Sequence, residues 1–280
     1  MFDWLAYVKA MADMLPRGLN WWFERRDPVR AQAARVLAAF EAHDIARTQI
    51  VRLLPPYLAL PMTAFVSAQS LREHLTPAFL DWVADFFMLD RAWLDCMPDT
   101  QPHSPYPHCF YKQPRELHQW LSERVGDHSL RFVLYVLKAD SGQPGERSEG
   151  PFALVFRENV SGLDDEALAR YELMSDGARF DHPSCIVDLL AACAVADSLS
   201  IALRGLVISR KRMQALEEGT MLIAAAIRRP EDYWRPERLL QPSQDASPWW
   251  QSIRKEATAW LEEAGLHHVQ ATLKPSNQTT

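Results

Sequence analysis

The chain has 280 residues, of which 48% are hydrophobic and 24% are charged, and this balance excludes a wholly disordered protein. A formal net charge of −6 argues against a protein whose whole surface binds nucleic acid, although a local basic face is compatible with it. The four cysteines show no CxxC spacing, which favours buried, reduced thiols over a disulfide framework. Without a secretory pattern or a long apolar span, we expect a cytoplasmic protein that does not enter a membrane.

Residues 1–27 are predicted to form an aromatic N-terminal arm. Phe2, Leu5 and Lys9 follow a roughly helical spacing, which Pro16 and Gly18 interrupt. We expect this arm to dock on its own chain or on a partner subunit.

Residues 28–97 predict an almost purely helical domain. Pro28 suits the first position of a helix. Asp44 is expected to cap a second helix, and the Pro55–Pro56 pair ends that helix.

The end of this helical domain carries the strongest local signals. Thr76 followed by Pro77 is typical of a helix start, with the threonine as cap and the proline in the first position. Asp90 is expected to cap a last short turn that holds Trp93 and Leu94.

Residues 98–114 contain five prolines, which exclude a regular helix and predict a linker between two domains. Residues 115–272 change to an α+β pattern, and residues 273–280 are expected to be a disordered tail. We expect four or five strands covered on one face by helices, as in PAS-like or similar sensor domains. The strand candidates are Leu130–Ala139, Phe152–Glu158, Tyr171–Met174 and Ile201–Ser209, and the helix candidates are Pro183–Ala196, Arg210–Arg229 and one within 241–272. The first two strands are expected to pair as a hairpin.

The order of elements in residues 29–97 resembles the Cro/lambda-repressor-like (XRE-type) family of helix-turn-helix domains. The resemblance lies in Arg35–Ile45, in Ala46–Leu54 and in Leu75–Leu94, which match the first helix with its turn, the second helix and the closing pair of helices. The resemblance implies a fold that binds DNA as a dimer through its third helix, which enters the major groove.

The segment in the place of that third helix, Leu58–Gln69, departs from the family because it contains no Lys or Arg. Across residues 26–98 there are seven Lys or Arg and eight Asp or Glu, so this domain offers little charge for phosphates. If it binds DNA, the expected contacts come from Arg47, Gln49, Arg52, Thr63, Ser67, Gln69 and Arg72.

Two groups of residues suggest chemistry without a recognised motif. Cys96, His103, His108 and Cys109 are zinc-type ligands, but their spacing is that of ordinary linker residues. The residues Asp181, His182, Ser184 and Cys185 fit a helix start, opened by Pro183 and capped by Asp181 or Ser184, better than a nucleophilic site. We therefore assign no catalytic residue, metal or cofactor.

Basic residues gather in the second domain, where Arg210 begins a helix after a strand, a place where an anion can bind. The expected ligand-binding residues are Arg179, Arg204, Arg210 and Arg212, although a solvated helix face explains them too.

The sequence favours a one-component transcriptional regulator in which a helix-turn-helix-like domain is coupled to an α/β domain that senses a small effector or forms a homodimer. One alternative is a scaffold or adaptor that uses the helical fold for protein contacts. Another is an enzyme with a dispersed active site in the α/β domain, built around Arg204, Asp181 and His182.

Overall fold

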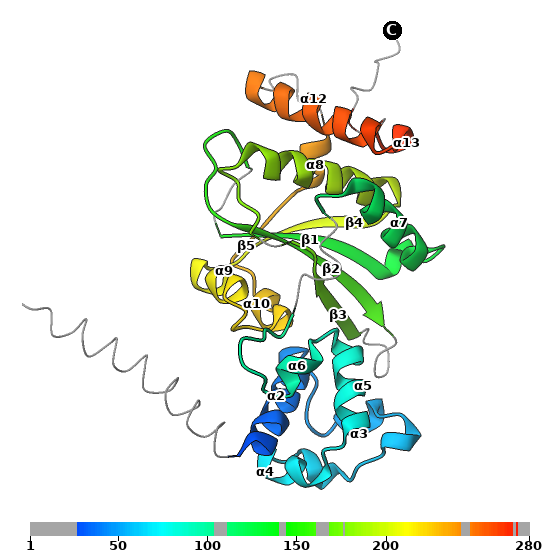
Figure 1. Cartoon of the computed structure of the whole chain (residues 1–280), viewed down its shortest axis with the longest axis vertical. Coiled ribbons are helices and arrows are strands. Elements are labelled where there is room, and N and C mark those ends of the chain that lie inside the picture. Colours follow the sequence, from blue (N-terminus) through cyan, green and yellow to red (C-terminus); the bar gives the residue numbers. More distant parts are fainter. Residues whose placement is uncertain are drawn as a thin grey trace, which may run out of the picture. The chain divides into compact units, whose positions relative to one another are not determined.

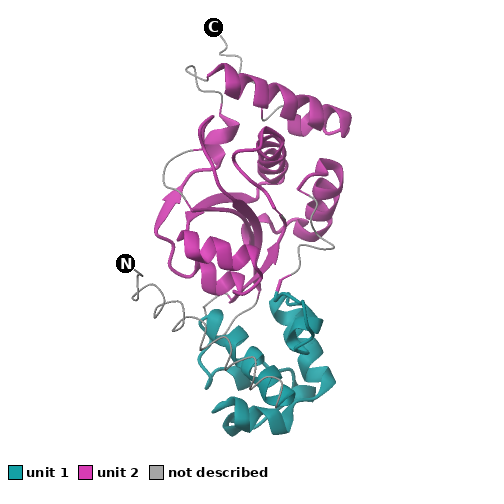
Figure 2. Cartoon of the chain, turned by 60° about the vertical axis from the view of Figure 1, so that its left-hand side comes forward, with its two compact units in different colours: residues 1–102 teal, residues 103–280 magenta. Residues whose placement is uncertain are grey.

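The computed structural model describes residues 27–103, 111–139, 144–160, 168–175, 177–241, 247–270 and 273. The chain divides into two compact units, Met1–Pro102 and His103–Thr280 (Figure 2). The division falls inside the segment predicted to be a linker. The arm predicted for residues 1–27 lies outside the described residues except for Asp27.

The first unit, called the helical unit below, is built of helices and 3-10 turns in its described residues, 27–102 (Figure 1). Its helices are α2 (Pro28–Ala42), α3 (Ile50–Leu53), α4 (Ala68–Leu71), α5 (Pro77–Phe87) and α6 (Arg91–Leu94), and its 3-10 turns are η1 (Pro56–Leu58), η2 (Met62–Phe65) and η3 (Arg72–His74). Two of the three predicted caps, Thr76 and Asp90, are confirmed. Thr76 accepts a hydrogen bond of 3.2 Å from the amide of Phe79, and Asp90 accepts one of 2.7 Å from the amide of Ala92.

Aromatic side chains fill the centre of the helical unit. Phe40 of α2 is fully buried, and its ring meets that of Phe87 edge to face at 4.9 Å. Phe65 of η2 and Phe79 of α5 are buried beside them. Edge-to-face pairs of this kind add to the stability that the buried area provides.

The prediction that Asp44 caps the second helix is wrong. Asp44 has a φ of +61°, and the amide of Ile45 donates to the carbonyl of Phe40 at 3.0 Å, while the amide of Asp44 donates to that of Glu41 at 3.2 Å. This pair of bonds is the Schellman arrangement that ends a helix. Asp44 therefore closes α2, and the second helix shrinks to the single turn of α3.

The second unit, called the C-terminal unit below, combines five strands with seven α-helices among its described residues. The strands are β1 (Phe132–Lys138), β2 (Phe152–Val160), β3 (Leu168–Leu173), β4 (Ala202–Val207) and β5 (Asp232–Trp234). The helices are α7 (Pro114–Val125), α8 (Pro183–Ser198), α9 (Arg210–Glu217), α10 (Ile223–Ile227), α11 (Glu237–Leu240), α12 (Pro248–Glu263) and α13 (His267–Gln270), with one 3-10 turn, η4 (Ser129–Arg131).

The strands form one mixed sheet in the order β3-β2-β1-β4-β5. β1 and β2 pair antiparallel from Phe132 opposite Glu158 to Lys138 opposite Phe152, which confirms the predicted hairpin. β4 runs parallel to β1, with Lys138 opposite Val207, so the carboxyl ends of these two strands lie together. β5 closes the edge antiparallel to β4.

Helices cover both faces of this sheet, so the expectation of helices on one face is wrong (Figure 1). Alternate residues of β1 point to opposite faces. Leu134 and Val136 join the core under α7, α8 and α12, whereas Leu137 joins a second core under α9 and α10. Because α8 is packed between the sheet and α12, it is apolar on nearly all sides.

Several boundaries differ from the prediction. The helix α7 begins at Pro114, inside the expected linker, and Tyr111 before it is fully buried. The predicted helix over Arg210–Arg229 is broken into α9 and α10. Leu273, placed in the expected tail, is 1% exposed and belongs to the core, while the rest of the tail lies outside the described residues.

The edge strand β5 is anchored by a tryptophan that lies across β4. Trp234 is 6% exposed, and its indole nitrogen donates a hydrogen bond of 3.2 Å to the carbonyl of Val136 in β1. The ring passes directly over Gly205, where a Cβ atom would lie 2.4 Å from it. Only glycine leaves room for this contact.

We expect Gly205→Ala to destabilise the C-terminal unit by about 1–3 kcal/mol, since the buried indole has to move to make room for the methyl group. Urea unfolding of the full chain measures this change. Gly145→Ala is the matched control, because a Cβ there meets open space. Equal stability of the two variants would contradict the tight contact.

We also expect the helical unit to lose stability in mild acid. Burial of the His43 ring, which lies 4.4 Å from the ring of Phe87, lowers its pKa from 6.5 to about 4. As the pH falls below 6.5, the His43 ring takes up a proton in the unfolded chain but not in the folded one. The free energy of unfolding is therefore unaffected by this ring above pH 6.5 and decreases as the pH falls towards 4, by about 3 kcal/mol at most.

The measurement is urea unfolding of the wild type and of His43→Gln at pH 7.5 and pH 4.5. The variant should show a smaller loss of stability between the two pH values, whereas the control His74→Gln should behave as the wild type does. An unchanged pH dependence in His43→Gln would show that this ring does not carry the effect.

Candidate ligand-binding pocket

Two of the three basic residues proposed to contact DNA, Arg47 and Arg72, form ion pairs within the helical unit. Arg47 forms an ion pair with Glu41, with a hydrogen bond of 2.9 Å from its Nε atom. Arg72 forms an ion pair of 2.6 Å with Asp27. The pKa of the Asp27 carboxyl is lowered, chiefly by the hydrogen bond from the Arg30 amide. Phosphate contacts by Arg47 and Arg72 would have to replace these ion pairs.

The polar candidates also serve local structure. The side-chain oxygen of Gln49 accepts from the amide of Ala46 at 3.0 Å, and Ser67 caps α4 by accepting from the amide of Ser70 at 3.1 Å. With the Gln69 side-chain amide turned so that its oxygen faces Arg72, that oxygen accepts a hydrogen bond of 3.1 Å from the Arg72 Nε atom. Arg52 and Thr63 are exposed on α3 and η2.

The segment expected to supply the third helix, Leu58–Gln69, contains no long helix. Between α3 and α5, a stretch that is fully described, each helix or 3-10 turn has at most four residues. Pro55 and Pro61 hold extended backbone immediately before η1 and η2. This segment therefore does not supply the long third helix that the resemblance implies.

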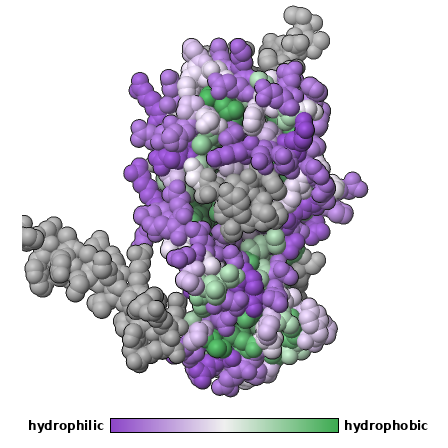
Figure 3. Space-filling view, in the orientation of Figure 1, coloured by the Kyte–Doolittle hydropathy of each residue, from purple (hydrophilic) through white to green (hydrophobic). Residues whose placement is uncertain are grey.

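This segment and Tyr57, the residue before it, instead expose apolar side chains. Tyr57 is 77% exposed, Val66 is 65% exposed and Met62 is 53% exposed. Figure 3 shows apolar surface on the helical unit in that view, whereas the C-terminal unit is mostly polar there. Exposed apolar groups that gather in one segment often mark a site of protein contact.

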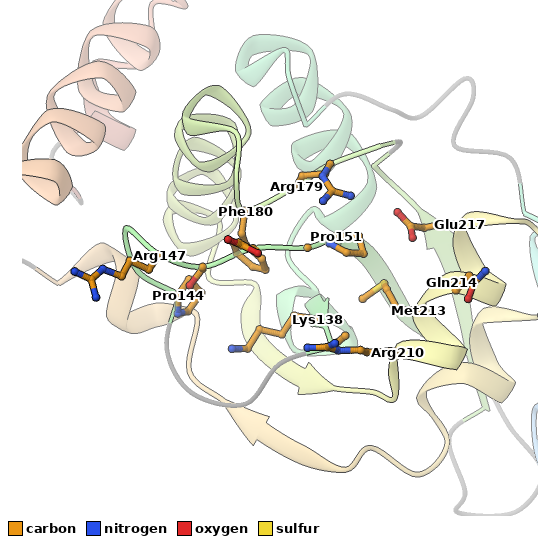
Figure 4. A pocket seen from close by; sticks show the side chains of 14 residues that line it. Lys138, Pro144, Arg147, Pro151, Arg179, Phe180, Arg210, Met213, Gln214 and Glu217 are labelled. Carbon is orange, nitrogen blue, oxygen red and sulfur yellow. The ribbon is translucent and has the colours of Figure 1, made fainter.

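A pocket of about 690 Å³ lies in the C-terminal unit beside the carboxyl ends of β1 and β4 (Figure 4). Its volume is within the range of small-molecule sites. It is lined by Lys138, Ala139, Pro144, Arg147, Ser148, Glu149, Gly150, Pro151, Arg179, Phe180, Arg210, Met213, Gln214 and Glu217. In sheets with parallel strands, ligands commonly bind at such carboxyl ends.

The sheet determines one side of the pocket. The last residue of β1, Lys138, accepts a backbone hydrogen bond of 2.9 Å from the amide of Ile208, which follows β4. Ser209 then caps α9 by accepting from the amide of Arg212 at 3.3 Å. These bonds place the backbone of Lys138 near the first turn of α9, whereas the Lys138 side chain lies over Trp234.

The connection into β2 forms the opposite side. Pro151 makes an isolated β-bridge with Arg179, and the amide of Phe180 donates to the carbonyl of Gly150 at 2.9 Å. The Phe180 ring packs on that of Phe152 at 4.7 Å, so this wall rests on the core. In this way the fold brings residues 144–151 and 179–180 to one pocket.

Positive charge dominates the lining, with four basic side chains and two acidic ones. Lys138 is only 4% exposed, and its ammonium lies 5.2 Å from the ring centroid of Trp234. In Figure 4 the side chains of Lys138 and Arg210 lie on one side of the pocket, those of Arg179 and Glu217 lie on the other, and Arg147 extends away from the other labelled side chains. Lys138 is the buried member of the four, whereas Arg179 is partly buried and Arg147 and Arg210 are exposed.

Arg179 influences two acidic residues near it. Asp181, outside the lining, accepts a hydrogen bond of 2.9 Å from the Arg179 Nε atom, which lowers the pKa of that carboxyl. Burial raises the pKa of Glu217, and the nearby Arg179 partly opposes this effect. The Arg179 side of the pocket therefore offers both hydrogen-bond donors and acceptors.

Of the four expected ligand-binding residues, Arg179 and Arg210 line the pocket and two do not. Arg204 is exposed on β4 and lies outside the lining. Arg212 donates a hydrogen bond of 2.6 Å to the carbonyl of Arg229, so it ties α9 to the chain after α10. Sequence reasoning missed Lys138, which also lines the pocket. The signal that could have found it is a single lysine at the end of an apolar strand.

The residues suspected of a nucleophilic or zinc site have structural roles where they are described. His182, not Asp181 or Ser184, occupies the N-cap of α8, and it makes no side-chain capping bond, while Pro183 opens the helix as predicted. Cys185 is buried in the core. His103 accepts a hydrogen bond of 3.2 Å from the amide of Ile223.

Among the described residues, no group of three or more His, Cys, Asp or Glu side chains is placed to hold a metal ion. Two residues of the suspected zinc set, His108 and Cys109, lie outside the described part of the chain. Within that part, no helix combines the length and the apolar character that crossing a membrane requires.

Comparisons of this chain with models of protein families, with curated proteins and with solved structures gave no match.

Proposed function

We propose that this protein is a ligand-responsive regulator whose C-terminal unit binds a small anionic molecule in the pocket at the ends of β1 and β4. The observation that carries this proposal is the gathering of four basic side chains around one cavity, one of them being the buried Lys138. An effector-sensing role of this kind needs no likeness to PAS domains, because it rests on the pocket itself.

The charges explain why the ligand would be an anion. Removing a lysine from water is costly unless an opposite charge or a comparable partner compensates. The face of Trp234 is one partner of the Lys138 ammonium, as a cation–π contact. An anion in the pocket would add charge-assisted hydrogen bonds from Lys138 and Arg210.

The helical unit would pass the ligand signal on to another molecule. Its surface supports contact with a protein partner more than recognition of DNA bases. Its candidate DNA residues Arg47 and Arg72 are held in ion pairs, and Tyr57, Met62 and Val66 expose apolar side chains in place of a third helix. The adaptor alternative therefore has more support for this unit than the DNA-binding one.

The test is a calorimetric titration of the full chain with inorganic phosphate. We expect saturable binding, and we expect Lys138→Met with Arg210→Gln to weaken it by roughly tenfold or more, because each charge-assisted hydrogen bond contributes about 1.5–3 kcal/mol. The matched control is Lys211→Gln, because Lys211 is exposed on α9 next to Arg210 but does not line the pocket.

Melting temperatures of both variants establish that they fold. Binding that is absent in the folded wild type, or that Lys211→Gln weakens as much as the double variant does, would refute the proposal.

DNA binding stays a second candidate, because α2, α3, α5 and α6 follow one another in the order that the helix-turn-helix resemblance implies. It predicts binding to duplex DNA with a steep dependence on salt, and a loss of affinity in Arg52→Gln. Fluorescence anisotropy at two salt concentrations measures both. Failure to bind at the lower concentration would remove this candidate and leave the protein-contact role.

A further inference from the structure

Two histidines from distant parts of the sequence face each other in the C-terminal unit. His118 lies on α7 and His268 lies on α13, and their Nε2 atoms are 3.2 Å apart. One turn before His118, the Arg115 Nε atom donates a hydrogen bond of 2.9 Å to the carbonyl of Ala264, which ties α7 to the chain that leads into α13. Val269, the residue after His268, is fully buried. The fold therefore holds both imidazoles on anchored elements.

Hydrogen bonds around His118 determine which of its ring nitrogens carries the proton. The Ser122 hydroxyl has a single hydrogen, and it donates this hydrogen to the carbonyl of His118 at 2.6 Å. The same Oγ atom lies 3.4 Å from the Nδ1 atom of His118, where it can only accept, so Nδ1 carries the proton. The lone pair of His118 is therefore on Nε2, the nitrogen that faces His268. A neutral imidazole in this state is a metal ligand, and a partner on its other nitrogen is the usual outer contact of such a ligand.

The spacing of the two rings fits a shared metal ion. In tetrahedral zinc sites the Zn–N distance is about 2.0–2.1 Å, which places two ligating nitrogens about 3.3–3.4 Å apart. The N–N distance of 3.2 Å agrees with this spacing to within about 0.2 Å. The ring centroids are 5.1 Å apart. A straight N–H···N hydrogen bond of this length would place the centroids about 5.5 Å apart, whereas rings that converge on one tetrahedral ion would place them about 5.1 Å apart.

The ligand set indicates the class of ion. Imidazole nitrogens suit zinc, copper and nickel, whereas magnesium and calcium prefer oxygen ligands. Across the residues that the structure describes, no third His, Cys, Asp or Glu side chain joins the pair. Two of the four positions around a tetrahedral ion are therefore left to water, as in zinc sites that keep open positions.

We propose that His118 and His268 form a binding site for Zn²⁺, in which the ion replaces the direct contact between the two rings and joins α7 to α13. The two ligands are 150 residues apart in the sequence, so the pair exists only in the folded chain. Zinc binding therefore stabilises the C-terminal unit against unfolding. This site shares no residue with the lining of the pocket at β1 and β4, and it does not depend on the function proposed for that pocket.

The experiment titrates the full chain with zinc chloride in a calorimeter and follows thermal unfolding with and without the ion. We expect saturable binding to the wild type and a melting temperature that rises with zinc. His118→Gln and His268→Gln should each weaken binding by roughly tenfold or more, since loss of even an outer partner of a metal ligand costs about 10–100-fold in affinity. Each variant should also lose the rise in melting temperature. Magnesium chloride should leave the wild type unchanged, because magnesium prefers oxygen ligands.

His267→Gln is the matched control, because His267 is exposed and directly precedes His268 on α13, where consecutive side chains point about 100° apart. It should keep the wild-type affinity for zinc. Melting temperatures without zinc establish that all three variants fold. Absence of zinc binding by the folded wild type would mean that the two rings form only a hydrogen-bonded pair, and binding that both His118→Gln and His268→Gln keep would place the ion elsewhere. Either result would overturn the proposal.

Discussion

A buried lysine at the end of an apolar strand is the constraint on which the pocket depends. Lys138 is 4% exposed, and a charge in that position is unfavourable unless its surroundings compensate for the loss of water. The face of Trp234 lies under its ammonium, and the indole is held there by its hydrogen bond to Val136 and by the missing side chain at Gly205. The short edge strand β5 thus supports the cationic side of the pocket although Trp234 itself does not line it.

The fold was predictable where a local pattern decides the structure. The β-branched run Leu130–Ala139 and the cap at Thr76 both predict the observed elements, because strand periodicity and helix capping act over a few residues. Asp44 shows the limit, since its side chain suits a cap but its backbone closes the preceding helix. The sequence does not reveal α7, because the prolines up to Pro114 indicate a linker, and β5 has only three residues, too few for a periodic signal.

The candidate site was only partly predictable, because it assembles residues that are far apart in the sequence. Arg210 was recognised from its place after a strand and before a helix, and Arg179 from the density of basic residues. Lys138 becomes a neighbour of Arg210 only through the parallel pairing of β1 with β4, which no local pattern reveals. Arg204 shows the reverse error, since it has the right charge but lies on an exposed part of β4. The charge of a residue therefore identifies it as a candidate for the site, but the pairing of the strands determines which candidates line the pocket.

Two-dimensional NMR of the full chain during a phosphate titration is the measurement that tests the central claim most directly. The account predicts that the amide signals of Ala139, Gly150, Arg179 and Arg210 move together along one saturable curve, because these residues line one pocket. It also predicts that the signal of Arg204 on β4 stays in place. Shifts that are absent, or that are spread over basic residues outside the pocket, would contradict the assignment of this cavity as an anion site.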